Sequence, residues 1–295
     1  MSLDEAAPAA DHVHARTLRL GGRVFRPGEP VVMGIVNRTP DSFYDNGRTY
    51  AFDAALDRVD EAVAEGAAIV DVGGVRAGEG THVTVAEEVR RVVPLIEAVR
   101  EHHPDVVVSV DTYRAGVADP ACRAGADLVN DVWGGWDAGL VDVAARYGAG
   151  IVCSHTGGRL PRAAPTPVRY DDVVVDVRRT VVAAAERAVA AGVRADAVVI
   201  DPAHDFGKDT PQSLELTRRL DELVDTGWPV LVALSRKDFV GDVLGVGPDE
   251  RLEGSLAAAA LCAWHGARIV RAHDVRATVR ALRMVAAVLD GRAEA

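Results

Sequence analysis

Short apolar runs in this chain each end in a residue that could bind a ligand or move a proton. The polar run-ends are Asn37, Asp71, Asp111, Asn130 with Asp131, His155, Asp201, Ser235-Arg236-Lys237, and Arg271 with His273. A single polar residue after a strand is usually structural, often as the cap of the next helix, which is the role we expect for Asp274. A whole set of such ends converging on one rim instead predicts a polar pocket.

These residues fall into two chemical groups. Asp111, Asn130 and Asp201 offer carboxylate and amide groups, which suit the edge of a flat heterocycle with adjacent N–H donors. Lys237, Arg271 and His273 are cations or can become cations, and the last two precede a predicted helix N-terminus, where barrels commonly hold phosphate. The sequence therefore predicts a site with a heterocycle at one end and an anion at the other.

The elements that must position these residues alternate along the chain. The apolar runs are 31–36, 68–72, 106–110, 127–131, 150–154, 197–201, 229–234 and 268–273, and amphipathic stretches separate them. The runs are continuously apolar, which is typical of parallel strands buried on both faces. Repeated βα units of this kind predict an α/β fold, a closed (β/α)₈ TIM barrel.

The stretch TLRLGGRVFRPG before the first run predicts a short N-terminal β-hairpin that turns at Gly21-Gly22 and could plug the bottom of the barrel. A doubly wound open sheet is the structural alternative. It is disfavoured because no GxGxxG follows the first strand.

Composition limits the classes of function. The chain has 295 residues, of which 48% are hydrophobic, enough for one barrel domain over 16–292 after a mobile tail over 1–15. The net charge of -11 argues against nucleic-acid and anionic-membrane partners. No signal peptide or membrane-length apolar run is present, and three distant cysteines suit buried thiols, so we expect a cytoplasmic protein.

The sequence contains few patterns that are typical of metal-binding sites. No HExxH spacing occurs, and His204 and Asp205 have only Asp201 as a nearby acid, so a structural zinc site is not expected. A Mg²⁺ ion bridged to a substrate phosphate remains possible, because it needs only one or two protein oxygens. The segment DFGK lacks the GxxxxGK[ST] pattern of a phosphate loop.

Several motifs in order resemble those of the dihydropteroate synthase family. They are NRTPDSFYDNG (37–47), DVGG (71–74), SVDT (109–112), LVNDVWGG (128–135), DPAHDFGK (201–208), LSRKDFVG (234–241) and RAHDV (271–275). The resemblance runs from about Pro30 to the last helix. It implies a barrel, usually dimeric, that joins p-aminobenzoate to 6-hydroxymethyl-7,8-dihydropterin diphosphate with Mg²⁺ and releases diphosphate.

The resemblance also implies roles for residues. Asp111, Asn130, Asp201 and Lys237 would hold the pterin, while Asn37, Arg271 and His273 would hold the diphosphate and its metal, with Asn37 as metal ligand. Lys237, Arg271 and His273 would be the catalytic residues, and Arg76 would stand in for an arginine of the family's second loop.

The chain departs from the family pattern around the second substrate. The second loop reads GGVRAG (73–78), two residues shorter than the family's GGESTRPG and without its Glu, Ser and Thr. Ala203 and Asp205 replace two glycines of the family's DPGxGFGK, which crowds the loop and adds negative charge. Arg38 and Tyr44 replace smaller residues, and Ser154 and Thr156 flank His155 where apolar residues are usual.

These departures indicate a divergent member or paralogue and leave four hypotheses. The first is a synthase that uses pterin diphosphate. The second is a pterin-binding or sensing paralogue without synthase activity. The third is an enzyme with a changed acceptor. That acceptor would be acidic if Arg38 and Arg76 point toward it, but both arginines could equally be solvated loop residues. The fourth, folate-dependent methyl transfer, fits the SRK and RAHDV segments less well.

Overall fold

The structure, a computed structural model, describes residues 16–39, 51–78, 80–162 and 168–290. The predicted mobile tail, Tyr44 and the predicted domain end at 292 lie outside these residues. Among the helices described, none is both long enough and apolar enough to cross a membrane.

Eight parallel strands form the barrel that the apolar runs predict. They are β3 (Val31–Asn37), β4 (Ile69–Gly73), β5 (Val107–Asp111), β6 (Leu128–Asp131), β7 (Gly150–Ser154), β8 (Val198–Asp201), β9 (Leu231–Ala233) and β10 (Ile269–Ala272). The order in the sheet is β8-β7-β6-β5-β4-β3-β10-β9. A parallel bridge from Ile200 to Val230 joins the two outer strands, so the barrel closes and the doubly wound alternative is wrong.

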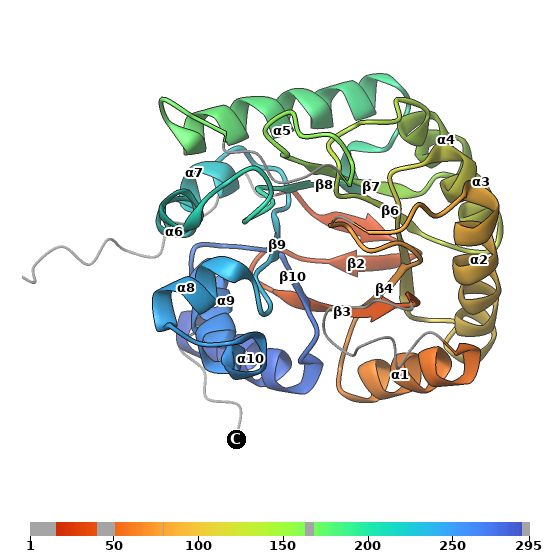
Figure 1. Cartoon of the computed structure of the whole chain (residues 1–295), viewed down its shortest axis with the longest axis horizontal. Coiled ribbons are helices and arrows are strands. Elements are labelled where there is room, and N and C mark those ends of the chain that lie inside the picture. The colour runs from red at the N-terminus through yellow and green to blue at the C-terminus, as the bar shows by residue number, and fades with distance from the viewer. Residues whose placement is uncertain (1–15, 40–50, 79, 163–167, 291–295) are drawn as a thin grey trace, which may run out of the picture.

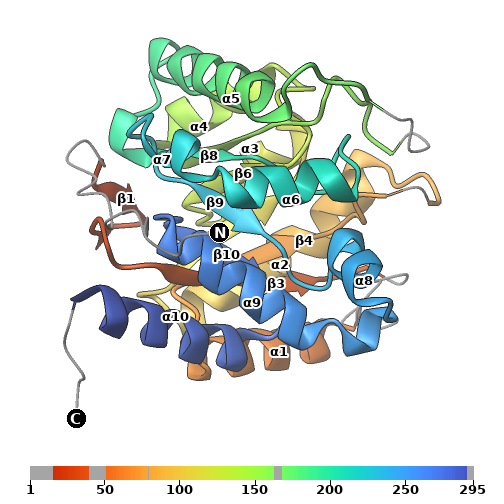
Figure 2. The same ribbon diagram turned by 90° about the vertical axis from the view of Figure 1, so that its left-hand side faces the viewer.

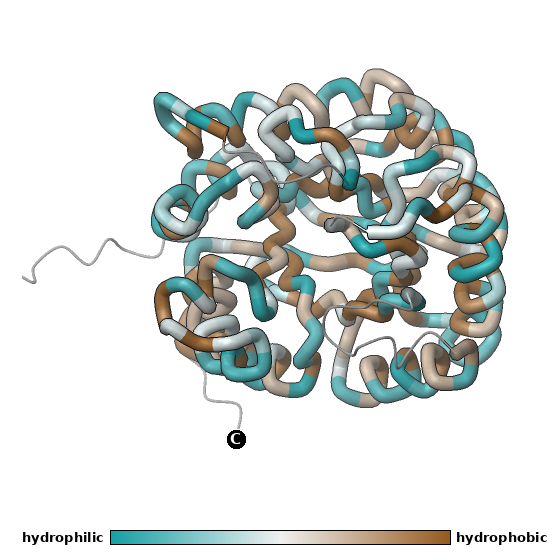
Figure 3. Tube along the Cα trace, viewed as in Figure 1, coloured by the Kyte–Doolittle hydropathy of each residue, from teal (hydrophilic) through white to brown (hydrophobic). Residues whose placement is uncertain are grey.

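Helices surround the strands on the outside (Figure 1). They are α1 (Phe52–Ala64), α2 (Val85–His102), α3 (Ala115–Arg123), α4 (Gly139–Tyr147), α5 (Val173–Ala190), α6 (Thr210–Arg218), α7 (Asp221–Val224), α8 (Asp238–Leu244), α9 (Leu252–Trp264) and α10 (Val275–Asp290). Short 3₁₀ turns lie at Ala195–Ala197 and Pro248–Glu250. Apolar residues concentrate on the strands and on the inward helix faces, with polar residues outside (Figure 3).

The predicted N-terminal β-hairpin is present and closes one end of the barrel. β1 (Leu18–Leu20) pairs with β2 (Arg23–Phe25), and Leu18, Leu20 and Phe25 are buried with inward-facing residues of the barrel strands. Gly21 has a φ of +52, and a Cβ there would meet the carboxyl group of Asp127 at 2.5 Å, so the tight turn requires glycine. In Figure 2 the hairpin lies at the end of the molecule away from α8.

Local sequence signals set several helix boundaries. Thr84 accepts from the backbone N–H of Glu87 at the start of α2, and Asp172 accepts from Val174 and Val175 at the start of α5. Asp209 and Gln212 form a capping box on α6. Each of these helices follows a strand by a loop, so the helix starts face the carboxyl ends of the strands, where the predicted site residues lie.

Candidate functional site at the carboxyl ends of the strands

The carboxyl ends of the strands bring most of the predicted residues onto one rim. Register places Gly73 of β4 beside Asp111 of β5, and Asp111 beside Asn130 of β6. Further round, Asp201 of β8 lies beside Ser154 of β7. A parallel barrel thus turns residues 19 to 47 positions apart into neighbours, as the sequence predicts for the rim of such a fold.

Arg271 forms the electrostatic centre of this rim. Its Nε donates to Asp71 Oδ2 at 2.6 Å, and its Nη2 donates to Asp111 Oδ2 at 2.7 Å. Asp71 is fully buried and also accepts from Ser109 Oγ at 2.6 Å. One guanidinium group therefore compensates two buried carboxyl groups. Arg271, predicted to bind the anion, contacts Asp111, predicted to bind the heterocycle, so the two predicted halves of the site are in direct contact.

Charge balance at this centre depends on the protonation of Asp111. Burial raises the pKa of Asp111 above its ordinary value, and the positive charge of Arg271 opposes that rise. The neighbouring Asp71 raises the pKa further. A carboxyl group with a raised pKa can both accept and donate hydrogen bonds near neutral pH, which suits an amide-like heterocycle edge.

Asn130 presents an acceptor that the described residues do not satisfy. Its Nδ2 donates to Asp71 Oδ2 at 3.0 Å, whereas its Oδ1 is buried without a hydrogen-bond partner among the described residues. A buried amide oxygen left unsatisfied is costly, about 1–3 kcal/mol, so such an atom usually marks a place where a ligand or water donates. The orphaned oxygen points to a ligand with an N–H donor.

Asp201 adds a third buried carboxyl group to the rim, at the end of β8. Its Oδ1 accepts from the backbone N–H of Ala203 at 2.7 Å. Burial raises its pKa, while the charges of Lys237 and Lys208 lower it. The positive charges of Lys237 and Lys208 therefore favour the ionised form of Asp201 against the effect of burial.

Both lysines of the chain hold this β8–α6 loop. Lys208 Nζ donates to the carbonyls of His155, Ala203 and Phe206 at 3.1, 3.0 and 2.8 Å, and burial lowers its pKa to about 7. Lys237 donates to the carbonyl of His204 and lies 4.9 Å above the ring of Phe206. Lys208 was not among the predicted site residues, although its place seven residues after the strand-end Asp201 was a signal.

The loop is backbone-strained where the family pattern has glycine. Ala203 has a φ of 51° and Asp205 a φ of 66°, both in the left-handed region that favours glycine. Asp205 Oδ2 accepts from the backbone N–H groups of Asp238 at 2.7 Å and Phe239 at 3.5 Å. An internal carboxylate therefore occupies the amides that follow Lys237, and burial raises the pKa of Asp205.

Aromatic rings line the same side of the rim. Trp133 packs edge-on against Phe206 with centroids 5.5 Å apart, and Tyr113 packs against Trp133 at 6.5 Å. Trp133 is almost wholly buried. Aromatic rings in the loops after β5, β6 and β8 suit a planar ligand at this rim. The sequence did not predict this cluster of Tyr113, Trp133 and Phe206, because its rings come from three separate loops.

His273 and its neighbours lie at the end of β10. The His273 backbone N–H donates to Ser235 Oγ at 3.2 Å, and its carbonyl accepts from Arg58 at 2.6 Å. Burial, with the charge of Arg271, lowers the pKa of His273 to about 3. The predicted cation is therefore a neutral imidazole at neutral pH in this structure.

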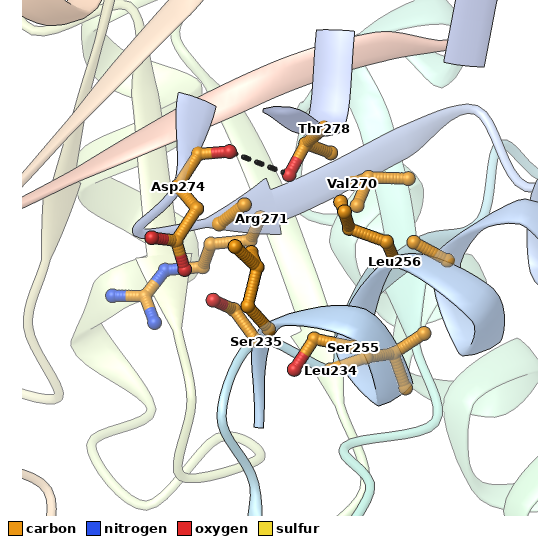
Figure 4. Close-up of a pocket in the computed structure, with 11 residues that line it drawn as sticks. Leu234, Ser235, Ser255, Leu256, Val270, Arg271, Asp274 and Thr278 are labelled. Carbon is orange, nitrogen blue, oxygen red and sulfur yellow. Dashed lines mark hydrogen bonds between the residues drawn. The ribbon is translucent and has the colours of Figure 1, made fainter. Parts of the chain in front are cut away.

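The cavity behind β10 is too small for a ligand. It lies between α9 and α10, holds about 10 Å³, and is lined by Ser235, Arg271, Asp274 and Thr278 among others (Figure 4). That volume is at the lower limit for a single water. The Asp274 carboxylate pairs with Arg236 at 2.9 and 3.0 Å, and its backbone carbonyl accepts from Thr278 in the first turn of α10.

Other predicted residues have structural partners away from the centre. Asp131 accepts from the backbone N–H groups of Trp133 and Gly135 and so holds a turn. His155 Nε2 lies 3.0 Å from Asp176 Oδ2 on α5. Arg38 Nη1 donates to the carbonyls of Arg91 at 2.9 Å and Arg90 at 3.4 Å, so it faces α2.

Asn37 and Arg76 are placed differently from each other. Asn37 ends β3 beside Gly73, where an added Cβ would lie 2.9 Å from Asn37 Oδ1 and 3.8 Å from Asp111 Oδ2. Arg76 lines a separate cavity with Arg91 and Arg162. The structure thus brings Asn37 to the rim centre and places Arg76 in another hollow.

The fold and the rim define a class: a (β/α)₈-barrel protein with a cluster of buried polar groups at the carboxyl ends of its strands, where such barrels carry their sites. Residues 33–273 match the family described as Pterin binding enzyme. The chain belongs to this family and is dihydropteroate-synthase-like.

The similar proteins are consistent with this family and with the departures of the chain from the usual dihydropteroate synthase motifs. The chain is 58% identical to the protein named Inactive dihydropteroate synthase 2 of Mycobacterium leprae, over 92% of this chain and 95% of that one. It is 38% identical to the dihydropteroate synthase of Escherichia coli, over 89% and 93%. The Yersinia pestis dihydropteroate synthase solved with a sulfonamide drug superposes with a TM-score of 0.87 at 37% identity, covering 94% of this chain and 100% of that one.

Proposed function

We propose that the chain binds 6-hydroxymethyl-7,8-dihydropterin diphosphate at the barrel rim. The observation that carries this is the buried Oδ1 of Asn130, which has no partner among the described residues, on the same rim as the carboxyl groups of Asp111 and Asp201. A pterin edge offers adjacent N–H donors and ring acceptors, which these three groups complement. The aromatic wall of Trp133 and Phe206 would cover the flat ring.

The diphosphate would lie at the ends of β3 and β10. Arg271 supplies the positive charge there, and His273, which is neutral in this structure, could donate or accept a hydrogen bond. Lys237 adds an ammonium group, which lies over the ring of Phe206. Cations aimed at a departing diphosphate would stabilise the charge that develops on it.

The donor set at the ends of β3 and β5 fits a magnesium ion. Asn37 Oδ1 and Asp111 Oδ2 both lie close to Gly73, where an added Cβ would lie 2.9 Å from the first and 3.8 Å from the second. Mg²⁺ takes oxygen ligands and usually keeps several waters plus substrate phosphate, so one or two protein oxygens suffice. When bound there, Mg²⁺ would neutralise charge on the diphosphate.

The acceptor step is where we propose that this chain differs. In the family reaction an amine nitrogen attacks the pterin methylene, the C–O bond to diphosphate breaks, and the amine loses a proton. Asp205 places a carboxylate beside Lys237 and fills the first amides of α8. Like charge disfavours p-aminobenzoate, which is a carboxylate, and the relative of Mycobacterium leprae is named inactive.

A second candidate is the complete condensation with p-aminobenzoate. It is favoured by the retention of Lys237 and Arg271 in the positions that the resemblance assigns to them. Turnover decides between the two candidates. The protein is incubated with dihydropterin diphosphate, p-aminobenzoate and Mg²⁺, and both dihydropteroate and diphosphate are quantified.

The proposed altered acceptor step predicts no dihydropteroate from wild-type protein. Dihydropteroate formation that Asp201→Asn abolishes would establish the second candidate. Product that persists in Asp201→Asn would come from a contaminant or from chemistry outside this rim.

We also propose that the chain forms a homodimer in the cytoplasm. Leu261 and Trp264 on α9 and Met284 and Val288 on α10 are large apolar residues that are 44–65% exposed on adjacent helices. Figure 2 shows α9 and α10 side by side on the outside of the barrel. The three cysteines are free buried thiols, which suits a reducing compartment.

A further inference from the structure

A second hollow lies on the rim, away from the central cluster. It has a volume of about 420 Å³ and lies between the loop after β4, the start of α2 and the loop after β7. Asp71, Asp111, Asn130, Asp201 and Arg271 do not line it. It is large enough for a small metabolite.

Positive charge dominates its lining. Three of its eight lining residues are arginines, Arg76, Arg91 and Arg162, and one, Glu87, is acidic. The Glu87 carboxylate is bonded to Arg90 and Arg91, and these bonds lower its pKa. In a chain with a net charge of -11, three guanidinium groups from three segments make a local positive site.

Backbone carbonyls hold two of the three guanidinium groups, those of Arg91 and Arg162. Arg162 donates to the carbonyls of Arg76 and Thr81, both at 2.8 Å, and its own backbone is left-handed with a φ of 60°. Arg91 donates to the carbonyl of Gly74 at 2.9 Å and also pairs with Glu87. The carbonyls orient Arg162 and Arg91 before any ligand arrives, and Arg162 is oriented without being neutralised by them.

The start of α2 adds to the same field. Thr84, the N-cap of this 18-residue helix, lines the hollow, so the positive end of the helix dipole faces it. Guanidinium groups match carboxylate and phosphate oxygens in paired hydrogen bonds. The cavity, the three arginines and the helix start all select for negative charge.

We propose that this hollow binds the phosphate or carboxylate group of an acidic small molecule, at a site separate from the central rim. Arg76 therefore serves this site and not the central diphosphate. The proposal does not depend on pterin binding, because the two sites share no residue of the central cluster.

Arginine side-chain Nε–H resonances test this site directly, because each reports on its own guanidinium group. Protein labelled with ¹⁵N-arginine is titrated with inorganic phosphate and, separately, with succinate. We expect the Arg76, Arg91 and Arg162 resonances to shift together with one dissociation constant. Shifts with phosphate alone identify a phosphate ligand, and shifts with succinate alone identify a carboxylate ligand.

Variants separate the hollow from general surface charge. Arg162→Gln should raise that dissociation constant at the Arg76 and Arg91 resonances at least tenfold, and Arg162→Lys should raise it less because the charge remains. Arg90→Gln is the matched control, since Arg90 lies on the same helix, is 69% exposed in its side chain and does not line the hollow.

Three results would overturn the proposal: no shift with either anion, an unchanged constant in Arg162→Gln, or an equal loss in Arg90→Gln. Melting temperatures of all variants show whether the loops remain folded. If Arg162→Gln unfolds, Arg162→Lys carries the same comparison, and a dissociation constant that is unchanged in Arg162→Lys, or raised equally in Arg90→Gln, counts against the site.

Discussion

Asp205 is the residue whose chemistry departs most from the family pattern. It is left-handed, buried in part, and bonded to the first amides of α8. We predict that Asp205→Asn, which removes the charge and keeps an oxygen acceptor, binds p-aminobenzoate about tenfold more tightly, a gain of about 1.4 kcal/mol. The measurement is a titration with p-aminobenzoate in the presence of pterin and diphosphate.

A matched substitution shows whether the charge of Asp205 in particular weakens p-aminobenzoate binding. Asp238→Asn removes a neighbouring carboxylate that is 79% exposed and paired with Arg251. It should leave p-aminobenzoate affinity nearly unchanged because solvent screens it. Equal affinity in wild type and Asp205→Asn would refute the role of Asp205 as an acceptor filter.

His155 gives a prediction about pH. Burial, with the charge of Lys208, lowers its pKa to about 4 from 6.5. The unfolded chain therefore takes up a proton as the pH falls through 6.5, while the folded protein stays neutral until about 4. The stability due to the neutral ring is complete above the unfolded pKa and is lost as the pH falls between these two values.

Denaturation at pH 7 and pH 5 measures this loss. For His155 alone it amounts to about 2 kcal/mol. His155→Gln can still donate to Asp176 but does not titrate, so its free energy of unfolding should fall less over that interval. A variant that loses as much stability as wild type would exclude His155 from the acid dependence.

Strands were the elements that the sequence predicted best. Each apolar run became one barrel strand, because strands buried on both faces must be apolar throughout and the eight runs share that constraint. The Gly21-Gly22 hairpin was equally clear, since only glycine tolerates its turn.

Loops could not be predicted in the same way, because distant partners decide them. Arg38 faces α2, Arg162 reaches carbonyls more than 80 positions away, and Arg271 spans 200 positions to Asp71. The residues at strand ends were predicted because chain order alone brings them to the rim. Their pairings depend on three-dimensional distances that no spacing in the sequence encodes.

Helix α2 shows one such pairing with a testable effect. Pro94 lies inside α2 and has no N–H for the carbonyl of Arg90. Arg38 donates to that carbonyl at 3.4 Å and to the next one at 2.9 Å. We predict that Arg38→Ala lowers the free energy of unfolding by about 1 kcal/mol and leaves pterin affinity unchanged.

Chemical denaturation and pterin titration check the two halves of this prediction. Arg90→Ala is the control, since it changes an exposed arginine on the same helix. A loss of pterin affinity in Arg38→Ala without a loss of stability would place Arg38 in the binding site and contradict its structural role.

At the scale of the whole molecule, the outer face of α9 and α10 predicts the oligomeric state. Met284 is 65% exposed and lies with Leu261 and Trp264 on this face. A charge buried in an apolar interface is costly, so Met284→Asp should convert a dimer to a monomer in sedimentation experiments.

Val243→Asp is the matched control, because Val243 is 54% exposed but lies on α8 and not on α9 or α10. It should leave the dimer intact. A wild-type protein that sediments as a monomer at all concentrations, or a Met284→Asp variant that stays dimeric, would rule out this interface.

The central claim is that the barrel rim still binds a pterin diphosphate. Calorimetric titration of the whole protein with 6-hydroxymethyl-7,8-dihydropterin diphosphate and Mg²⁺ tests it most directly, with Asp201→Asn beside the exposed control Asp171→Asn. We predict one site per chain, at least tenfold weaker in Asp201→Asn and unchanged in Asp171→Asn. Absence of binding by wild type, or equal affinity in Asp201→Asn, would contradict the account.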